Sequence, residues 1–418
     1  MRSIIVRGGQ SLSGEVYVEG AKNSALKLMA AALMAPGTTR IANVPEISDV
    51  ETMGEVISGL GARVERTDHS LAIDASDLTS FEAPYEMVAR MRASISVLGP
   101  LIARLGQARV AMPGGCAIGS RKIDMHIRGL EALGVQVETG HGYIHASAPG
   151  GLVGTEVTLD FPSVGATENL LMAAVLARGT TVIENAAREP EIQDLAAFLS
   201  GMGARIEGEG SPVITIEGVD GLHGTDHRVV GDRIEAGTFL IAAAITGGRV
   251  RVRGFDPRHM DMVLSKLGQV GCSVELHEDG ATLSCSGRPR PVDVQTLPYP
   301  GYPTDMQAQH MALMAIAEGD CVITENVFEN RFMFADELAR MGADVRIEGH
   351  HALIKGVAQL SGAPVRSPDL RGGAALVLAG LAAEGTTHVS EIHHIERGYE
   401  RFVDKLAALG AKIEMTAE

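Results

Sequence analysis

A glycine-rich segment at residues 113–126 places one cysteine beside two cations. Cys116 is flanked by glycines and is followed closely by Arg121 and Lys122. Glycines let the backbone bend close to a ligand, and a guanidinium group can bind a phosphate or carboxylate through two parallel hydrogen bonds. Neighbouring cations favour the thiolate, so this cysteine is predicted to be reactive. The alternative interpretation is a surface turn with an incidental cysteine.

Charged and polar residues also stand where several apolar helices are expected to begin. Helix N-termini offer free N–H groups and a partial positive charge, which attract anions. Cations are unfavourable there, so their presence at these starts suggests that a bound anion compensates them. The residues in question are Lys22 with Asn23, Arg92, Ser163 with Val164 and Gly165, Arg233, Asp305, and Asp369 with Arg371. The alternative is that these residues are ordinary helix caps. Lys405 does not belong to this group and is expected to lie on a solvated face.

One helix–turn–strand pattern recurs six times at a spacing of roughly 70 residues, far above the period of a solenoid. The first helix of each copy is rich in Ala, Leu and Met on nearly every face, which predicts a helix buried inside a domain. These helices are expected at residues 23–34, 93–104, 166–177, 236–245, 306–317 and 373–383. A second, amphipathic helix follows in each copy and ends at a glycine before a strand. Each copy therefore predicts a βαβαββ unit.

The ends of the chain indicate how the six units are divided. Residues 4–14 parallel residues 353–362, so the N-terminal strands are expected to complete the last unit. We predict one domain at residues 21–228 and a second that combines residues 229–418 with residues 1–20. Two crossings between the domains would form a hinge, and a cleft between domains is a common ligand site. Pseudo-threefold packing would bring three helix starts together in each domain.

The composition excludes several classes of function. The 418 residues carry a net charge of −16, aromatic residues make up 4%, and Trp is absent, so nucleic acid is not an expected partner. The start of the chain is too quickly polar for a signal peptide, and no apolar run is long enough to span a membrane. The four cysteines lack metal-ligand spacing, so we predict no metal and four free thiols in a reducing cytoplasm.

Short stretches in both halves of the chain together resemble one family. They are Glu-Gly-Ala-Lys-Asn at 19–23, Met-Arg-Ala-Ser-Ile at 91–95, the segment 113–121, Glu-Asn-Ala-Ala-Arg-Glu-Pro-Glu at 184–191, Asp-Arg-Ile-Glu-Ala-Gly-Thr-Phe at 232–239, Pro-Thr-Asp-Met-Gln-Ala-Gln at 303–309, Phe-Glu-Asn-Arg-Phe at 328–332, Asp-Leu-Arg at 369–371 and Arg-Gly-Tyr-Glu-Arg at 397–401. The chain resembles the UDP-N-acetylglucosamine 1-carboxyvinyltransferase family of enolpyruvyl transferases. The resemblance implies an α/β fold of two inside-out α/β barrels, each with three βαβαββ repeats.

The resemblance also implies a reaction. The family transfers the enolpyruvyl group of phosphoenolpyruvate to the 3′-hydroxyl of UDP-N-acetylglucosamine and releases phosphate. It does so by addition and elimination through a tetrahedral ketal in a closing interdomain cleft, as the first committed step of peptidoglycan synthesis. The implied partners are these two substrates, without a cofactor, in the cytoplasm. A monomer is expected, and an oligomer stays open.

Individual residues match the family's functional positions. Phosphoenolpyruvate would bind to Lys22, Asn23, Arg121 and Arg397. The nucleotide sugar would contact Asn23, Arg92, Arg121, Lys122, Ile123, Asp124, Met125, Ser163, Val164, Gly165, Asp305 and Val327. By resemblance, Cys116 donates the proton to the methylene carbon and forms covalent adducts with phosphoenolpyruvate or fosfomycin. Asp305 is the candidate base for the sugar hydroxyl. Lys22 and Arg397 complete the expected catalytic set.

Two departures and two alternatives accompany this interpretation. Ser48 and Phe161-Pro162 stand where some members carry a lysine near the nucleotide. The shikimate-pathway enolpyruvyl transferase has the same fold and donor, but it usually has a Lys-Ser motif at its first helix and lacks the cysteine segment. The other alternative is a non-catalytic paralogue that binds a UDP-sugar, which the intact set of Cys116, Asp305, Lys22 and Arg397 disfavours.

Overall fold

The computed structural model describes residues 2–83, 85–88, 91–112 and 123–417. The chain divides into two compact units, each described separately. The N-terminal unit comprises the described residues between 20 and 230. The C-terminal unit comprises residues 2–19 together with residues 231–417. None of the described helices is both long and apolar enough to cross a membrane.

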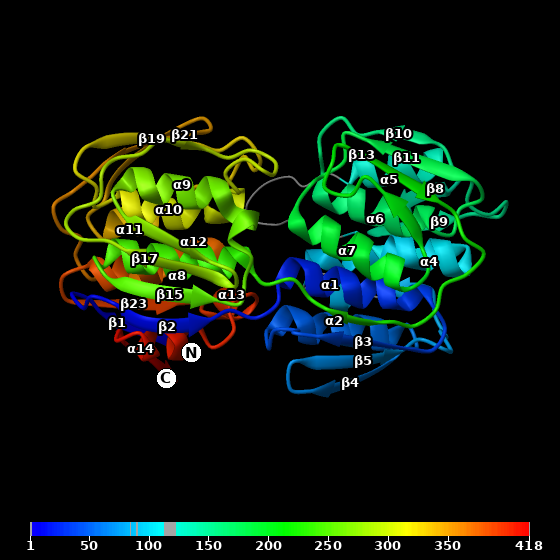
Figure 1. Ribbon diagram of the computed structural model, residues 1–418, viewed down its shortest axis with the longest axis horizontal. Helices are drawn as coiled ribbons and strands as arrows, with labels where there is room; N and C mark the ends of the chain where they lie inside the picture. The colour runs from blue at the N-terminus through cyan, green and yellow to red at the C-terminus, as the bar shows by residue number, and fades with distance from the viewer. Residues whose placement is uncertain (1, 84, 89–90, 113–122, 418) are drawn as a thin grey trace. The chain divides into compact units, whose positions relative to one another are not determined.

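The N-terminal unit contains three successive repeats (Figure 1). The first consists of β14 (Asp226–Arg228), α1 (Lys22–Ala31), η1 (Ala32–Met34), β3 (Thr38–Ala42), α2 (Ser48–Gly59), β4 (Arg63–Thr67) and β5 (Ser70–Asp74). The second consists of β6 (Glu82–Ala83), α3 (Tyr85–Val88), η2 (Arg92–Val97), α4 (Leu98–Leu105), β7 (Gln107–Ala111), α5 (Asp124–Ala132), β8 (Gln136–Gly140) and β9 (Tyr143–Ser147). The third consists of β10 (Glu156–Thr158), α6 (Val164–Ala174), β11 (Thr180–Glu184), α7 (Pro190–Gly201), β12 (Arg205–Glu207) and β13 (Val213–Glu217).

The C-terminal unit repeats the same order. Its first repeat consists of β2 (Ser13–Tyr17), α8 (Arg233–Ile245), β15 (Arg249–Arg253), η3 (Pro257–Met260), α9 (Asp261–Val270), β16 (Ser273–His277) and β17 (Gly280–Ser284). The second consists of β18 (Val294–Gln295), η4 (Thr304–Met306), α10 (Gln307–Met314), β19 (Asp320–Thr324), α11 (Ala335–Arg340), β20 (Asp344–Glu348) and β21 (His351–Lys355). The third consists of β22 (Pro364–Arg366), α12 (Leu370–Ala382), β23 (Thr386–Ser390), α13 (His393–Glu396), α14 (Phe402–Ala408), β24 (Lys412–Ala417) and β1 (Arg2–Arg7).

All six repeats form the same four-stranded sheet. A first strand runs parallel to a second, which pairs antiparallel with a third, which pairs antiparallel with a fourth, as in β14-β3-β5-β4 and β18-β19-β21-β20. This common topology confirms the six predicted βαβαββ units. Glycine ends the second helix of each repeat at a positive φ, a conformation that glycine adopts without steric cost. These glycines are Gly61, Gly134, Gly203, Gly271, Gly342 and Gly410.

The Ala- and Leu-rich helices form the interior of each unit. In the C-terminal unit α8, α10 and α12 contact one another, and every residue of α8 is buried. The N-terminal unit has its own core, to which α1, α4 and α6 contribute. Helices that are apolar on all faces bury more surface inside a domain than on its exterior, which explains this placement.

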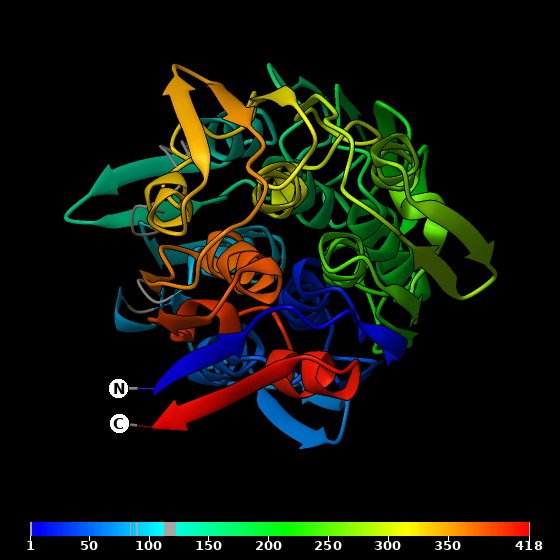
Figure 2. The same cartoon turned by 90° about the vertical axis from the view of Figure 1, so that its left-hand side faces the viewer.

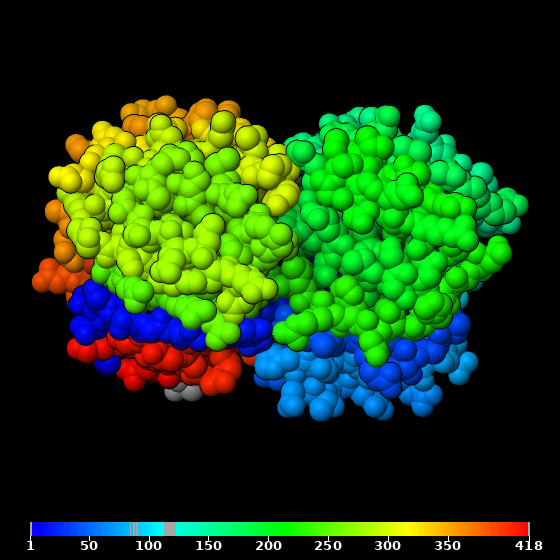
Figure 3. All heavy atoms as spheres, viewed as in Figure 1, coloured from blue at the N-terminus to red at the C-terminus, as the bar shows by residue number. Residues whose placement is uncertain are grey.

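The first residues of the chain belong to the sheets of the C-terminal unit. Strand β1 pairs antiparallel with both β23 and β24, and β2 runs parallel to β15. The two chain ends therefore lie side by side (Figure 2). Figure 3 shows the N-terminal segment on the surface between the C-terminal segment and the region of β15 and β17. The predicted completion of the last repeat is confirmed for β1, whereas β2 joins the first repeat of the C-terminal unit.

The expectation of four free cysteines is wrong for one pair. Cys272 and Cys285 form a disulfide, and their Cα atoms lie 4.4 Å apart. Cys272 precedes β16 and Cys285 follows β17, and the register pairs Ser273 with Ser284. The hairpin therefore holds the two cysteines opposite each other, at a separation that a disulfide can bridge.

Candidate active site

Lys22 and Asn23 are the first two residues of α1. Nζ of Lys22 lies 2.7 Å from Oδ2 of Asp49 in the first turn of α2, and both side chains are buried. A carboxylate of the protein thus balances this cation at a helix start. Lys22 therefore needs no bound anion to balance its charge, contrary to the expectation from the sequence.

The start of α6 carries three predicted ligands of the nucleotide sugar. The Oγ of Ser163 caps the helix by accepting a hydrogen bond from the backbone N–H of Ala166 at 3.4 Å. Val164 and Gly165 form the first turn. A Cβ on Gly165 would lie 3.1 Å from the imidazole ring of His126, so this position has little room for a side chain.

His126 lies beneath that turn and was not predicted. Its Nδ1 lies 3.0 Å from Nδ2 of Asn169, whose Oδ1 accepts a hydrogen bond from the N–H of Gly99 at 2.8 Å. The amide therefore donates to Nδ1, and the imidazole proton belongs on Nε2. Burial, together with the positive charges of Arg92 and Lys27, lowers the pKa of His126 to about 4. The ring is neutral at pH 7.

The remaining predicted residues of the N-terminal unit adjoin this histidine. Ile123 is the N-cap of α5, and Asp124 and Met125 are its first residues. Asp124 pairs with Arg128 at 3.2 Å, and Arg92 begins η2, which contacts α6. The starts of η2, α5 and α6 are thus brought together. Cys116, Arg121 and Lys122 lie outside the described residues.

In the C-terminal unit, Asp305 is held by two arginines. Oδ1 accepts from Arg331 at 2.8 Å, and Oδ2 accepts from Arg371 at 3.2 Å. Both guanidinium groups are buried, whereas the Asp305 side chain is 24% exposed. Two positive charges face one carboxylate, and this arrangement favours the ionised form of the acid.

Glu325 connects Val327 to this cluster. Its Oε1 accepts hydrogen bonds from the N–H of Val327 at 2.8 Å and from Oγ1 of Thr296 at 2.7 Å. Its Oε2 accepts from Oγ1 of Thr304, the residue before Asp305, at 2.9 Å. One buried carboxylate thus fixes the segment of Val327 beside the start of η4. Arg371 was expected at the start of its helix, whereas Glu325 and Arg331 were not predicted as site residues.

Arg397 lies at the C-terminal end of the short helix α13 and is partly buried. Partial burial lowers the pKa of the nearby His394, and the charges of His393 and Arg397 add to this effect. Helix α13 contacts α12, whose first turn contains Arg371. The guanidinium of Arg371 also stacks over the ring of Tyr399 at 5.2 Å. Arg397 therefore ends a helix that packs against the helix carrying Arg371.

The start of α8 contains a buried ion pair. Nζ of Lys405 lies 2.8 Å from Oε1 of Glu235, and the Lys405 side chain is only 14% exposed. The expectation that Lys405 is solvated is therefore wrong. Burial raises the pKa of Glu235 to about 7, and repulsion from Asp232 and Glu400 adds to this rise.

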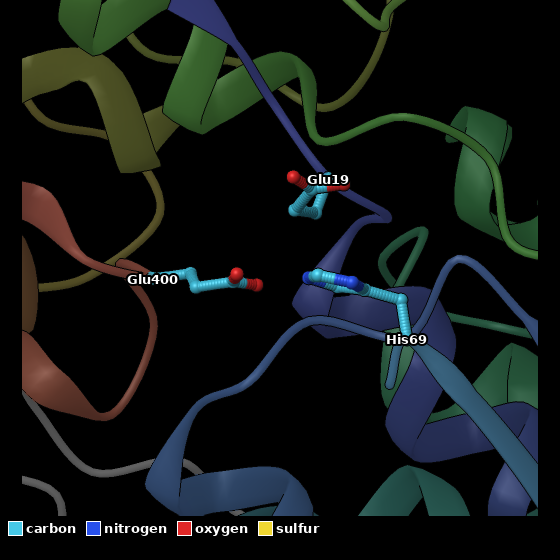
Figure 4. A group of neighbouring side chains, drawn as sticks. All are labelled: Glu19, His69 and Glu400. Carbon is cyan, nitrogen blue, oxygen red and sulfur yellow. The ribbon is translucent and has the colours of Figure 1, made fainter. Parts of the chain in front are cut away.

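Glu400 also approaches a second carboxylate. Its carboxylate and that of Glu19, both in the C-terminal unit, extend toward one another, with oxygens within 4.8 Å (Figure 4). His69, drawn in the same figure, lies in the turn between β4 and β5 of the N-terminal unit, and its carbonyl accepts from the N–H of Val44 at 2.8 Å. None of these three residues was predicted as part of a site.

Comparison with known proteins gives one consistent result. Residues 6–406 match the family described as EPSP synthase (3-phosphoshikimate 1-carboxyvinyltransferase). The chain is 54% identical to "UDP-N-acetylglucosamine 1-carboxyvinyltransferase 2" of Carboxydothermus hydrogenoformans and 50% identical to the UDP-N-acetylglucosamine 1-carboxyvinyltransferase of Trichlorobacter lovleyi, in each case over 100% of both chains.

The solved structures agree with this result. The enolpyruvyl transferase NikO from Streptomyces tendae superimposes with a TM-score of 0.89 at 28% identity, covering 100% of this chain and 99% of that one. The resemblance noted in the sequence is therefore confirmed by the sequences and by the fold. The chain belongs to the enolpyruvyl transferase family, and within it to the group of UDP-N-acetylglucosamine 1-carboxyvinyltransferases.

Proposed function

We propose that this protein transfers the enolpyruvyl group of phosphoenolpyruvate to the 3′-hydroxyl of UDP-N-acetylglucosamine and releases inorganic phosphate. The observation that carries the proposal is the 54% identity, over the full length of both chains, to a relative whose name states this transfer. The reaction would be the first committed step of peptidoglycan synthesis. We place it in the cytoplasm, where phosphoenolpyruvate and nucleotide sugars are made.

The reaction proceeds in two steps that balance in protons. In the addition, the sugar oxygen attacks C2 of phosphoenolpyruvate while C3 gains a proton, which gives a tetrahedral ketal. In the elimination, phosphate leaves C2 with the proton that came from the sugar hydroxyl, and the new methyl group returns a proton to the protein, which restores the double bond. Cys116 is the proposed donor to C3, and Asp305 is the proposed acceptor of the hydroxyl proton.

The contacts of Asp305 support its assignment as a base. Arg331 and Arg371 each donate one hydrogen bond to a carboxylate oxygen, which orients the group. The same guanidinium groups favour the ionised form, and only that form accepts a proton.

The donor substrate carries a phosphate and a carboxylate, so its binding requires several cations. We assign Lys22, Arg121 and Arg397 to phosphoenolpyruvate, with Asn23 as a hydrogen-bonding ligand. Fixed cations stabilise the charge that develops on the departing phosphate, and loss of one such donor costs on the order of 10²–10³ in rate.

The nucleotide sugar is assigned to residues at helix starts. Asn23, Arg92, Ser163, Val164, Gly165, Asp305, Val327 and residues 121–125 form the proposed set. The N–H groups in the first turn of α6 suit an anionic diphosphate. Some relatives carry a lysine where this chain has Phe161 and Pro162, so this end of the proposed site has less positive charge here than in those relatives.

A phosphate-release assay tests the proposal against its alternatives. The purified protein is mixed with phosphoenolpyruvate and with either UDP-N-acetylglucosamine or shikimate-3-phosphate, and inorganic phosphate is measured. Release only with the nucleotide sugar supports the proposal. Release with shikimate-3-phosphate supports the activity in the family's description, and release with neither supports a non-catalytic binding protein.

A further inference from the structure

One carboxylate in the N-terminal unit joins three separate segments. Asp194 lies on α7, and its side chain is 9% exposed. Its Oδ2 accepts hydrogen bonds from Oγ of Ser24 at 2.5 Å and from the N–H of Val230 at 3.2 Å. Its Oδ1 lies 2.8 Å from Nε2 of His227 on β14. A carboxylate only accepts, so each of these groups donates to it.

The bond to Ser24 acts on the start of α1. Ser24 directly follows Lys22 and Asn23 and is fully buried. The N-cap of α1 is Ala21, whose side chain makes no hydrogen bond to the helix, so the first turn lacks the usual capping bond. The bond to Asp194 therefore anchors the turn from which two of the proposed ligands of phosphoenolpyruvate, Lys22 and Asn23, project.

The bond to Val230 acts on the segment that leaves the unit. The N–H of Ala21 donates to the carbonyl of Val230 at 2.7 Å, and Nδ2 of Asn43 donates to the carbonyl of Val229 at 2.9 Å. The residue that precedes α1 and the last residues of the unit are thus held together at Asp194. His227 is fixed on its other side by the ring of Phe198, which meets it edge-on at 5.5 Å.

We propose that Asp194 is a positioning residue for phosphoenolpyruvate binding, acting through Ser24 on Lys22 and Asn23. This inference rests on the proposed function. Hydrogen bonds to a charged acceptor are stronger than neutral ones, and in a buried site water cannot replace a lost donor. Loss of the Ser24 hydroxyl therefore leaves the start of α1 free to shift. This shift weakens the binding of phosphoenolpyruvate more than a general loss of fold stability would.

Three substitutions test the proposal kinetically. Ser24→Ala removes the donor, Ser24→Thr keeps it, and Thr158→Ala removes a hydroxyl–carboxylate bond of 2.7 Å to Glu184 in the same unit. We expect Ser24→Ala to raise the KM for phosphoenolpyruvate about tenfold and the KM for the nucleotide sugar less, because one such bond corresponds to roughly a tenfold change in affinity. Ser24→Thr and Thr158→Ala should stay within about twofold of the wild type.

A second readout does not depend on turnover. Hydrogen exchange of the peptide that covers residues 20–30 is measured in the wild type, in Ser24→Ala, in Asp194→Asn and in the control Thr158→Ala, with thermal melting to show that each is folded. We expect faster exchange at the start of α1 in both variants and no change in Thr158→Ala. An inactive wild type with this exchange pattern refutes the proposed function but supports the anchoring. An active Ser24→Ala with unchanged KM and exchange overturns the inference.

Discussion

The ammonium group of Lys22 lies 2.7 Å from the carboxylate of Asp49, and the two side chains are 10% and 4% exposed. The first turn of α1 is thereby joined to the first turn of α2. A cation proposed to bind substrate already has a buried partner, so its position is set before any ligand arrives.

We expect Asp49→Leu to lower the free energy of unfolding by about 3–5 kcal/mol, because it leaves a buried ammonium group without its partner. The double variant Lys22→Met/Asp49→Leu should recover most of this loss, because it buries no unpaired charge. Urea unfolding at pH 7 measures both. The exposed pair of Arg205 and Glu217, at 2.9 Å, provides the control, and Glu217→Leu should stay within about 1 kcal/mol of the wild type. A double variant as unstable as Asp49→Leu would contradict this account.

Asp305→Asn should lower kcat by on the order of 10²–10⁴ while the protein remains folded, because the amide cannot accept the hydroxyl proton. The amide keeps one acceptor for Arg331 or Arg371, so the cluster is less disturbed than by a truncation. Steady-state phosphate release measures the effect. Asp256→Asn, which removes a carboxylate paired with the exposed Arg258, is the control. A kcat within twofold of the wild type in Asp305→Asn would exclude the assigned role.

Arg397→Ala should weaken the binding of phosphoenolpyruvate far more than that of UDP-N-acetylglucosamine, because only the donor substrate is assigned to this cation. Isothermal titration with each ligand compares the two affinities. The neighbouring Arg401, whose guanidinium is paired with Asp404 at 3.1 Å and is mostly exposed, gives the control variant Arg401→Ala. Equal weakening of both ligands would count against the assignment.

Fosfomycin should add once to the protein, at Cys116. The other thiols are poor targets: Cys272 and Cys285 are joined in a disulfide, and burial raises the pKa of Cys321 to about 12. A thiol of such high pKa carries almost no thiolate at pH 7, and the thiolate is the nucleophile. Intact-mass spectrometry of the wild type and of Cys116→Ser checks this, and an adduct that persists in the variant would refute it.

Acid should destabilise the C-terminal unit through His310. Burial lowers the pKa of this residue to about 4, whereas an exposed histidine titrates near 6.5. The unfolded chain therefore binds the proton more readily, so this contribution to stability is fully present above pH 6.5. It is lost progressively as pH falls toward and below 4, by about 3 kcal/mol in total.

The variant His310→Gln tests whether protonation of this histidine causes the predicted loss of stability in acid. Its amide can still donate to the carbonyl of Val292, which Nε2 of His310 reaches at 3.0 Å, but it does not titrate. The melting temperature of the variant should fall less than that of the wild type between pH 6.5 and 4, and the exposed His141→Gln should behave like the wild type. Parallel melting profiles for His310→Gln and the wild type would contradict the prediction.

The repeats could be predicted because their signals are local. A glycine such as Gly61 stops each second helix, and an all-apolar helix such as α8 has no face to present to water. The disulfide could also have been predicted, because two five-residue strands with a short turn place Cys272 opposite Cys285, and a spacing of 13 residues fits this hairpin.

Partners that lie far apart in the sequence could not be predicted. Asp194 meets Ser24 across 170 residues, and Lys405 meets Glu235 across the same separation. No periodicity reports such a pairing, because it depends on how whole helices pack. For the same reason Lys405 was expected to be solvated. The proposed substrate-binding residues stand in recognisable sequence motifs, whereas the residues that position them can be identified only from their contacts in the structure.

Pairing of β1 with β23 and β24 has a consequence for biosynthesis. On the ribosome, residues 2–7 emerge first, but their partners at 386–390 and 412–417 emerge last. At about 5–20 residues per second, the first strand waits for roughly 20–80 s with its backbone unpaired. During that interval residues 20–230 can already close their three sheets. The part of the chain that is translated first is therefore among the last to find its place.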